Sequence, residues 1–287
     1  MNKFKIFWYS SFFLIGLFLI FLTFFSSSFS FLTFPFYIKY LVVGALAFFC
    51  EYMDSSIGMG YGTTLTPILL IFGFAPLTIV PLVLISEMFT GFLAGFFHHK
   101  EKNVNLSFKS RSFKVILVLS IFSIIGVLCG GFINLSLSKF YVKLYIGLMI
   151  LCVGLFLKFG SHLLNKFSWI KMIGIGSLAA FNKTISGGGY GPLLTGGQVL
   201  SGMEEKEAIS ITSVTEGFVC LLGIVLYLIT FGFIFNIGLG LALVIGAVLS
   251  VPLAAKTVKV LPKNILKKTI SYVTIFLGLL TIFKLFV

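Results

Sequence analysis

A glycine-rich stretch, Asn182 to Gly197, interrupts a chain that is otherwise almost continuously apolar. It reads NKTISGGGYGPLLTGG, with three consecutive glycines followed by a tyrosine, a proline and further glycines. Backbone of this kind cannot face lipid, because each unpaired N–H or C=O group costs several kcal/mol in hydrocarbon. The stretch therefore predicts an irregular segment at membrane depth that is buried in protein or lines a cavity.

A second copy of this pattern lies upstream, where residues 57–67 read IGMGYGTTLTP. A shift of 129 residues without gaps places Tyr61 on Tyr190 and, in the apolar segment that follows, Glu87 on Glu216. Glycine and leucine matches are common in such a composition, whereas a matched tyrosine within glycines and a matched glutamate within an apolar run are not. The pattern therefore indicates an internal duplication.

The composition places the whole chain in a membrane. Hydrophobic residues make up 59% of the 287 residues and charged residues only 10%, against roughly a quarter charged in a soluble domain. The net charge of +13 does not indicate nucleic-acid binding, because the basic residues stand at the ends of apolar segments, where they set topology. We expect an all-α integral membrane protein whose surroundings are the lipid bilayer, and a homo-oligomer is compatible with this sequence.

Apolar segments long enough to approach the roughly 20 residues of a helical crossing divide the chain. They are residues 4–25, 38–57, 76–97, 113–133, 139–157, 169–185, 208–230, 234–254 and 265–287. The apolar pieces that follow the two glycine stretches, 63–72 and 193–200, are too short to cross. The predicted organisation is an extra N-terminal transmembrane helix and loop (1–37), a first membrane repeat (38–159) and a second membrane repeat (160–287).

Lysine and arginine in the connecting loops predict the orientation. The 256–268 loop carries five lysines and the 98–114 loop is also basic, whereas the loops 26–37, 73–76 and 231–236 carry no Lys or Arg. Basic loops face the cytoplasm, so we expect a multi-pass protein of the cell (inner or plasma) membrane with a cytoplasmic N-terminus. The same loops give the two repeats opposite orientations. In transporters with inverted repeats, the interrupted segments of both halves meet near the midplane and form the solute site.

Five ionisable residues fall at membrane depth, at an insertion cost of about 2.5–3.5 kcal/mol for the most polar types. They are Glu51, Asp54, Glu87, Lys183 and Glu216. The symmetric placement of Glu87 and Glu216 favours a role in proton coupling, and the alternative is a neutral glutamate hydrogen-bonded between helices. Glu51 and Asp54 are predicted to be buried charge partners. Asp54 and Lys183 occupy equivalent repeat positions, so Lys183 either pairs with Asp54 or faces the solute.

The glycine stretches also suggest a solute site, because consecutive backbone N–H groups at the start of a helix bind anions. The predicted substrate-binding residues are Gly58, Gly60, Tyr61, Gly62, Thr63, Lys183, Gly187, Gly188, Gly189, Tyr190 and Gly191. The alternative role for glycine in a membrane helix is close helix packing, which we assign instead to Gly16, Gly126, Gly147 and Gly238.

Enzyme chemistry has little basis in this sequence. It contains no G-x-x-x-x-G-K-[ST] phosphate loop and no Ser-His-Asp or Cys-His grouping. His98 and His99 are adjacent, so they point to different faces of a helix and do not favour a shared metal. We expect no catalytic activity, no cofactor and no bound metal.

These motifs resemble the TauE/SafE family of sulfite-exporter-like permeases. The resemblance covers about residues 40–285 and rests on IGMGYGTTLTPILLIFG, SGGGYGPLLTGGQVLSG and the basic loop HHKEKNVN. Met59 and Tyr61 interrupt the glycine run that is usual in the first loop of this family, which leaves the substrate less defined than the fold. The resemblance implies a multi-pass permease for small anions such as sulfite, organosulfur anions or carboxylates, which works without ATP and is coupled to protons.

The function expected is therefore a secondary transporter for a small anion, with alternating access between inverted repeats. One alternative is a divalent metal or other cation permease, because four buried acidic residues outnumber one buried lysine. Another is a membrane accessory protein that transports nothing.

Overall fold

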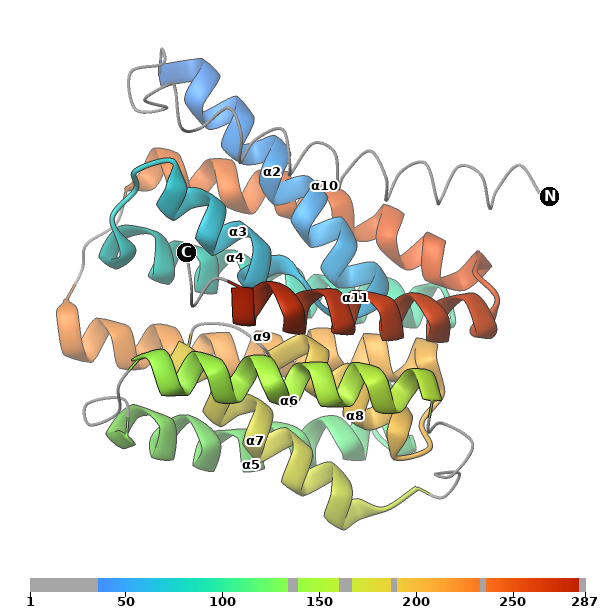
Figure 1. The fold of residues 1–287 in the computed structure, drawn as a ribbon. Helices are drawn as coiled ribbons and strands as arrows, with labels where there is room; N and C mark the ends of the chain where they lie inside the picture. Colours follow the sequence, from blue (N-terminus) through green and yellow to red (C-terminus); the bar gives the residue numbers. More distant parts are fainter. Residues whose placement is uncertain (1–35, 134–138, 160–166, 187–189, 233–235, 284–287) are drawn as a thin grey trace.

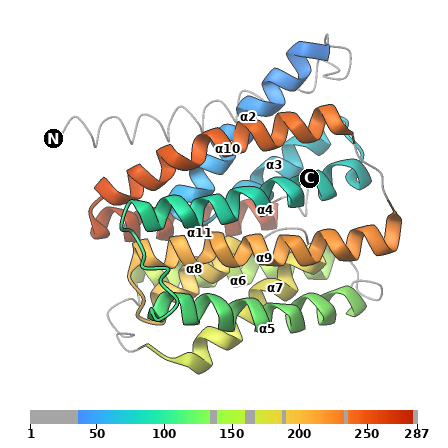
Figure 2. The same ribbon diagram turned by 180° about the vertical axis from the view of Figure 1, so that it is seen from behind.

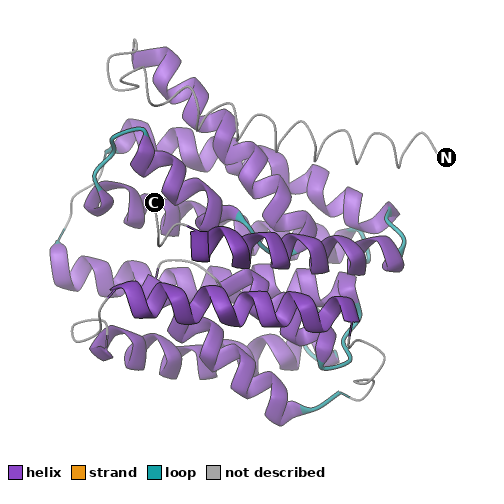
Figure 3. Ribbon diagram, viewed as in Figure 1, coloured by secondary structure: helices purple, strands orange, loops and turns teal. Residues whose placement is uncertain are grey.

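The computed structural model describes residues 36–133, 139–159, 167–186, 190–232 and 236–283, and these residues are helical with short connections and no strand (Figure 3). The predicted all-α membrane architecture is confirmed for this part of the chain. The extra N-terminal helix predicted over residues 4–25 lies outside the described residues.

Ten helices are described, eight of them long and two short. They are α2 (Phe36–Ile57), α3 (Tyr61–Ile71), α4 (Pro76–Lys100), α5 (Arg111–Ile133), α6 (Lys139–Phe159), α7 (Trp169–Ser186), α8 (Tyr190–Leu200), α9 (Glu205–Phe231), α10 (Ile237–Val260) and α11 (Lys263–Phe283). Five of the described helices are long and apolar enough to cross a membrane, namely α2, α4, α5, α9 and α10. The chain is a multi-pass membrane protein.

The order and lengths of the helices recur in the two halves of the chain. The two short helices, α3 and α8, begin at Tyr61 and Tyr190, and the long helices that follow them begin at Pro76 and Glu205. Both intervals equal the 129-residue shift of the sequence comparison. The predicted boundary between repeats, at 159/160, falls at the C-terminal end of α6.

The two halves interlock instead of lying side by side. Helix α2 packs against α10 and α7 packs against α5, so the long helix before each glycine stretch lies on a helix of the other half. Helices α4 and α9, and likewise α6 and α11, also pack across the two halves. Figures 1 and 2 show that α3 turns back toward the end of the bundle where α2 begins, and α8 toward the end where α7 begins. The short helices therefore leave the middle of the bundle in opposite directions.

Glycines permit the closest of these helix contacts. A Cβ atom on Gly246 of α10 would lie 2.7 Å from the carbonyl carbon of Gly44 on α2, and one on Gly126 of α5 would lie 2.9 Å from the backbone nitrogen of Phe181 on α7. Real Cβ atoms do not approach backbone so closely, so these crossings require glycine. The packing role predicted for Gly126 is confirmed.

Three connections lie together at one end of the bundle. Lys259 near the end of α10 donates to Glu101 after α4 at 2.8 Å, and the Lys206 ammonium at the start of α9 donates to the backbone carbonyl of Lys259 at 2.6 Å. The hydrogen bond from Lys259 lowers the pKa of the Glu101 carboxyl below its ordinary value. Asn103 also donates to the carbonyl of Ala255 on α10 at 2.8 Å. This end contains the basic loops that predict the cytoplasmic side.

Candidate functional site

The two interrupted segments meet inside the bundle. The Thr195 hydroxyl on α8 donates to the carbonyl of Gly58 at 2.7 Å, and a Cβ atom on Gly191 would lie only 2.6 Å from the same carbonyl oxygen. Gly58 and Gly60 have φ angles of 79° and 131°, a region that favours glycine. The sequence-derived expectation that both glycine stretches contribute to one place is supported by these contacts.

The irregular backbone is shorter than the sequence suggests. Between α2 and α3 it covers only residues 58–60, and Tyr61, Gly62 and Thr63 already belong to the first turn of α3. In the second half, Asn182 and Lys183 still belong to α7, and α8 begins at Tyr190. Glycine and proline occur readily in the first turn of a helix, where backbone N–H groups have no helical partner. Gly187, Gly188 and Gly189, which were predicted to bind the solute, lie outside the described residues. The side chain of Thr63, also predicted to bind the solute, is outside the described side chains.

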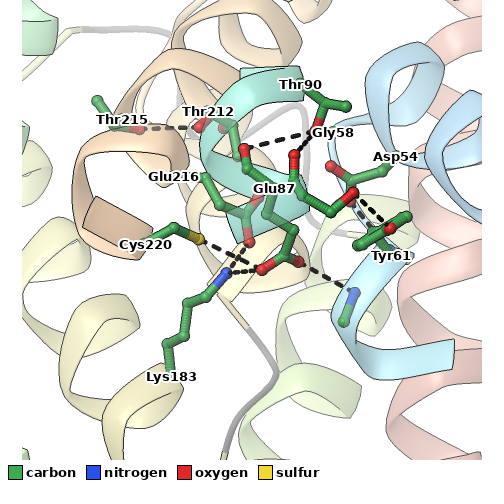
Figure 4. A network of polar contacts seen from close by, with 12 residues as sticks. Asp54, Gly58, Tyr61, Glu87, Thr90, Lys183, Thr212, Thr215, Glu216 and Cys220 are labelled. Carbon is green, nitrogen blue, oxygen red and sulfur yellow. Dashed lines mark hydrogen bonds and ion pairs between the residues drawn. The ribbon is translucent and has the colours of Figure 1, made fainter. Parts of the chain in front are cut away.

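Lys183 is the centre of the site. Its ammonium lies 2.9 Å from Glu87 Oε2 and 2.6 Å from Glu216 Oε1, and the three side chains are between 4% and 8% exposed. Helices α7, α4 and α9 each supply one member of this triad (Figure 4). The pairing of Lys183 with Asp54, one of two expectations from the repeat alignment, is wrong for the described contacts.

Glu87 is surrounded by hydrogen-bond donors. In addition to Lys183, its Oε2 accepts from the thiol of Cys220 at 3.3 Å, and its Oε1 accepts from the backbone N–H of Gly62 at 3.1 Å. Gly62 lies in the first turn of α3, where the helix dipole and free N–H groups stabilise an anion. The protein thus places one of its own carboxylates at the predicted anion-binding end of this short helix.

Glu216 has a different environment. Its Oε1 accepts from Lys183, but its buried Oε2 has no hydrogen-bond partner among the described residues. A carboxylate oxygen without a donor is costly in a medium of low dielectric constant. The two symmetric glutamates are therefore equivalent in sequence position and not in hydrogen bonding.

The other two predicted acids, Glu51 and Asp54, lie next to this triad on α2. Ser55 donates to Glu51 Oε1 at 2.6 Å and Thr90 donates to its Oε2 at 3.0 Å. Asp54 Oδ1 accepts from the backbone N–H of Tyr61 at 3.3 Å. Both acids are buried, as expected, and their partners are neutral hydroxyl or backbone groups.

The matched tyrosines also differ in their contacts. The hydroxyl of Tyr61 lies 2.8 Å from Ser86 Oγ, whereas the buried hydroxyl of Tyr190 has no hydrogen-bond partner among the described residues. The ammonium of Lys183 lies 5.6 Å from the centre of the Tyr190 ring, within cation–π range. Tyr190 is thus part of the lysine site and Tyr61 is held in the helix packing.

Sequence reasoning missed several polar members of the site, because their types are unremarkable in an apolar helix. Cys220 follows Glu216 by four residues, Thr212 precedes it by four, and Thr90 follows Glu87 by three. Their helical spacing from a buried glutamate could have identified these residues, since residues three or four apart share one face of a helix. Among the described residues, no group of three or more His, Cys, Asp or Glu side chains is arranged to hold a metal.

Comparison with known proteins identifies the relatives of this chain. It is 26% identical over 200 residues to the "Probable membrane transporter protein YtnM" of Bacillus subtilis (strain 168), a match that covers 64% of this chain and 66% of that protein, just under two thirds of its length. No solved structure matches the chain. The sequence profile described as "Sulfite exporter TauE/SafE" matches residues 40–281, which include every described helix in whole or in large part. The chain therefore belongs to the TauE/SafE sulfite exporter family.

Proposed function

We propose that this protein is a secondary transporter that moves a small anion across the cell membrane in a proton-coupled cycle. Membership of the sulfite exporter family and the name of the Bacillus relative support transport as the activity. The solute class that we propose is sulfite, an organosulfur anion or a small carboxylate.

The observation that carries this proposal is the buried ion triad. A lysine ammonium with two carboxylates inside a membrane bundle is costly to build, and such residues commonly mark ion or proton pathways. If one carboxylate is protonated, Lys183 loses a counter-charge and gains affinity for an external anion. Proton binding and anion binding would then favour each other, which is the requirement for coupling.

The arrangement of the short helices supports alternating access as the mechanism. The helices α3 and α8 start beside each other and run to opposite ends of the bundle, and the triad lies where they start (Figures 1 and 4). Transporters built from inverted repeats bind their solute between broken helices of this kind, near the middle of the membrane. Rocking one half against the other would open the site to each side in turn, with the basic end facing the cytoplasm.

The buried lysine disfavours a cation as the solute. A divalent metal at the triad would lie against the ammonium of Lys183, which already binds the nearest oxygens of Glu87 and Glu216. Repulsion between like charges is strong in such surroundings. An anion avoids this repulsion and can replace a carboxylate as the partner of Lys183.

Proteoliposomes with an imposed pH gradient test this function. Radiolabelled sulfite and sulfoacetate should accumulate in response to the gradient, and Lys183→Met should abolish this accumulation. Glu205→Gln, on the same helix as Glu216 but at its hydrophilic start, serves as the matched control and should retain the flux. Flux of Mn²⁺ without any anion flux would refute the proposal and make the four buried acids candidate metal ligands.

A further inference from the structure

The two glutamates of the triad have unequal surroundings, and this inequality assigns them different roles. Both oxygens of Glu87 are satisfied: Oε1 by the N–H of Gly62, and Oε2 by Lys183 and Cys220. Charged hydrogen bonds and a helix N-terminus stabilise the ionised form of a carboxyl group. These contacts tie Glu87 to α3, α7 and α9 as a fixed anion.

Glu216 has only one of its two oxygens occupied. Its Oε2 is buried without a partner among the described residues, and the buried hydroxyls of Tyr190 on α8 and Ser123 on α5 likewise make no hydrogen bond of ordinary length and angle there. The hydroxyl of Tyr190 faces Ser123 and Thr215, and Lys183 lies over its ring. Buried polar groups almost always have partners, so the unpaired polar atoms of Glu216 and Tyr190, two residues that both contact Lys183, indicate where a ligand would bind.

We propose that Glu216, and not Glu87, is the exchangeable counter-charge of Lys183. A proton neutralises Glu216, and the oxygen of a singly charged oxyanion then takes its place on the ammonium, with Tyr190 and Ser123 donating their hydroxyls to the same solute. This inference rests on the proposed anion transport and names the residue that couples it to protons.

The charges balance in this exchange. The empty triad has two carboxylates and one ammonium, a net charge of −1. Protonation forms one O–H bond on Glu216 and breaks its ion pair, and the bound monoanion restores the lost negative charge. The loaded site therefore also carries −1, so the costly buried charge does not change through the cycle.

Other titratable groups surround Glu216, but they are present in both the empty and the loaded site. Glu87 faces it from α4, Lys183 from α7, Glu51 and Asp54 from α2, and Tyr190 from α8, while Cys220 lies one turn away on α9 itself. Helices α5 and α11, which also pack on α9, bury the uncharged Ser123 and Thr274. Coupling through Glu216 predicts transport of one proton with each monovalent anion, without net movement of charge.

Paired glutamine variants separate the two roles, since glutamine resembles a protonated glutamate in shape and charge. We expect Glu216→Gln to retain exchange of radiolabelled methanesulfonate, whose own charge does not change with pH, between equal pools but to lose the pH dependence of this exchange. In wild type the exchange rate should change by up to about tenfold per pH unit where protonation of Glu216 limits binding. Glu87→Gln should lower exchange at every pH and keep the wild-type profile. Glu216→Asp should restore the pH dependence, and Glu205→Gln should match wild type throughout.

A second measurement uses only the unaltered protein, so it does not depend on the folding of any variant. Uptake of methanesulfonate, an anion with a single fixed charge, should follow a pH gradient and remain unchanged by a K⁺ diffusion potential set with valinomycin. A response to that potential, or loss of the pH dependence in Glu87→Gln instead of Glu216→Gln, would overturn this inference alone. Absence of any anion flux in the wild type would overturn the proposed transport function itself.

Discussion

The matched tyrosines show how one residue type has different consequences at two equivalent positions. The Tyr61 hydroxyl is bonded to Ser86 on α4, whereas the Tyr190 hydroxyl has no partner among the described residues. Removing one partner of a buried hydrogen bond costs about 1 kcal/mol, so Tyr61→Phe should lower the thermal stability of the detergent-purified protein. Tyr190→Phe should leave stability unchanged or higher, and should instead raise the KM for sulfite. Equal loss of stability in both variants would contradict the hydrogen-bond assignment.

At the residue scale, the sequence predicts which side chains are buried better than it predicts their partners. An ionisable residue in an apolar run is conspicuous, and all five residues chosen on this ground are buried. Their pairing depends on how helices far apart in sequence cross, and Lys183 is 96 residues from Glu87 and 33 from Glu216. Repeat symmetry suggested Asp54 as one possible partner of Lys183, because a shift in sequence identifies equivalent positions without telling which of them lie close together.

At the scale of single elements, the contact between the two interrupted segments is open to a direct test. A Cβ atom on Gly191 would lie 2.6 Å from the Gly58 carbonyl oxygen and 2.8 Å from the Cα of Met59. Forcing an extra methyl group into packed surroundings costs about 1–3 kcal/mol, and here it would push α3 and α8 apart at the site. Gly191→Ala should therefore reduce both thermal stability and anion flux in proteoliposomes.

Gly174→Ala on α7 is the matched control for this substitution. A Cβ atom there meets nothing within 4 Å, and alanine is favoured over glycine inside a helix by about 0.5–1 kcal/mol. The control should be at least as stable and active as wild type. Tolerance of Gly191→Ala at full flux would mean that the close approach of the short helices is not needed for transport.

The short helices also show what sequence patterns resolve at this scale. The apolar pieces after each glycine stretch predicted two segments too short to cross, and α3 and α8 have 11 residues each. Their starts were placed too late, because the tyrosine and glycine that open each helix were assigned to a loop. A glycine in the first turn of a helix and a glycine just before the helix look alike in sequence. Only the backbone conformation distinguishes the two.

At the scale of the whole molecule, the interlocking of the two halves was not predictable from hydropathy. Apolar periodicity marks which segments are helices, but a lipid-exposed face and a face buried against another helix are both apolar. The sequence therefore predicted all ten described helices. It did not predict that α2 would pack on α10, or α7 on α5. The orientation of the helices across the membrane is, in contrast, open to prediction, because it depends on the charges of the loops.

The two ends of α4 offer a test of that orientation. A helix rises about 1.5 Å per residue, so its 25 residues place Ala75 and Lys102 on opposite sides of a bilayer, and both residues are exposed. In a background lacking the exposed Cys129 and Cys152, Ala75→Cys should react with a membrane-impermeant maleimide on intact cells. Lys102→Cys, in the basic loop, should react only after lysis. The reverse pattern would place the basic loops outside, and labelling of both cysteines from one side would show that α4 does not cross the membrane.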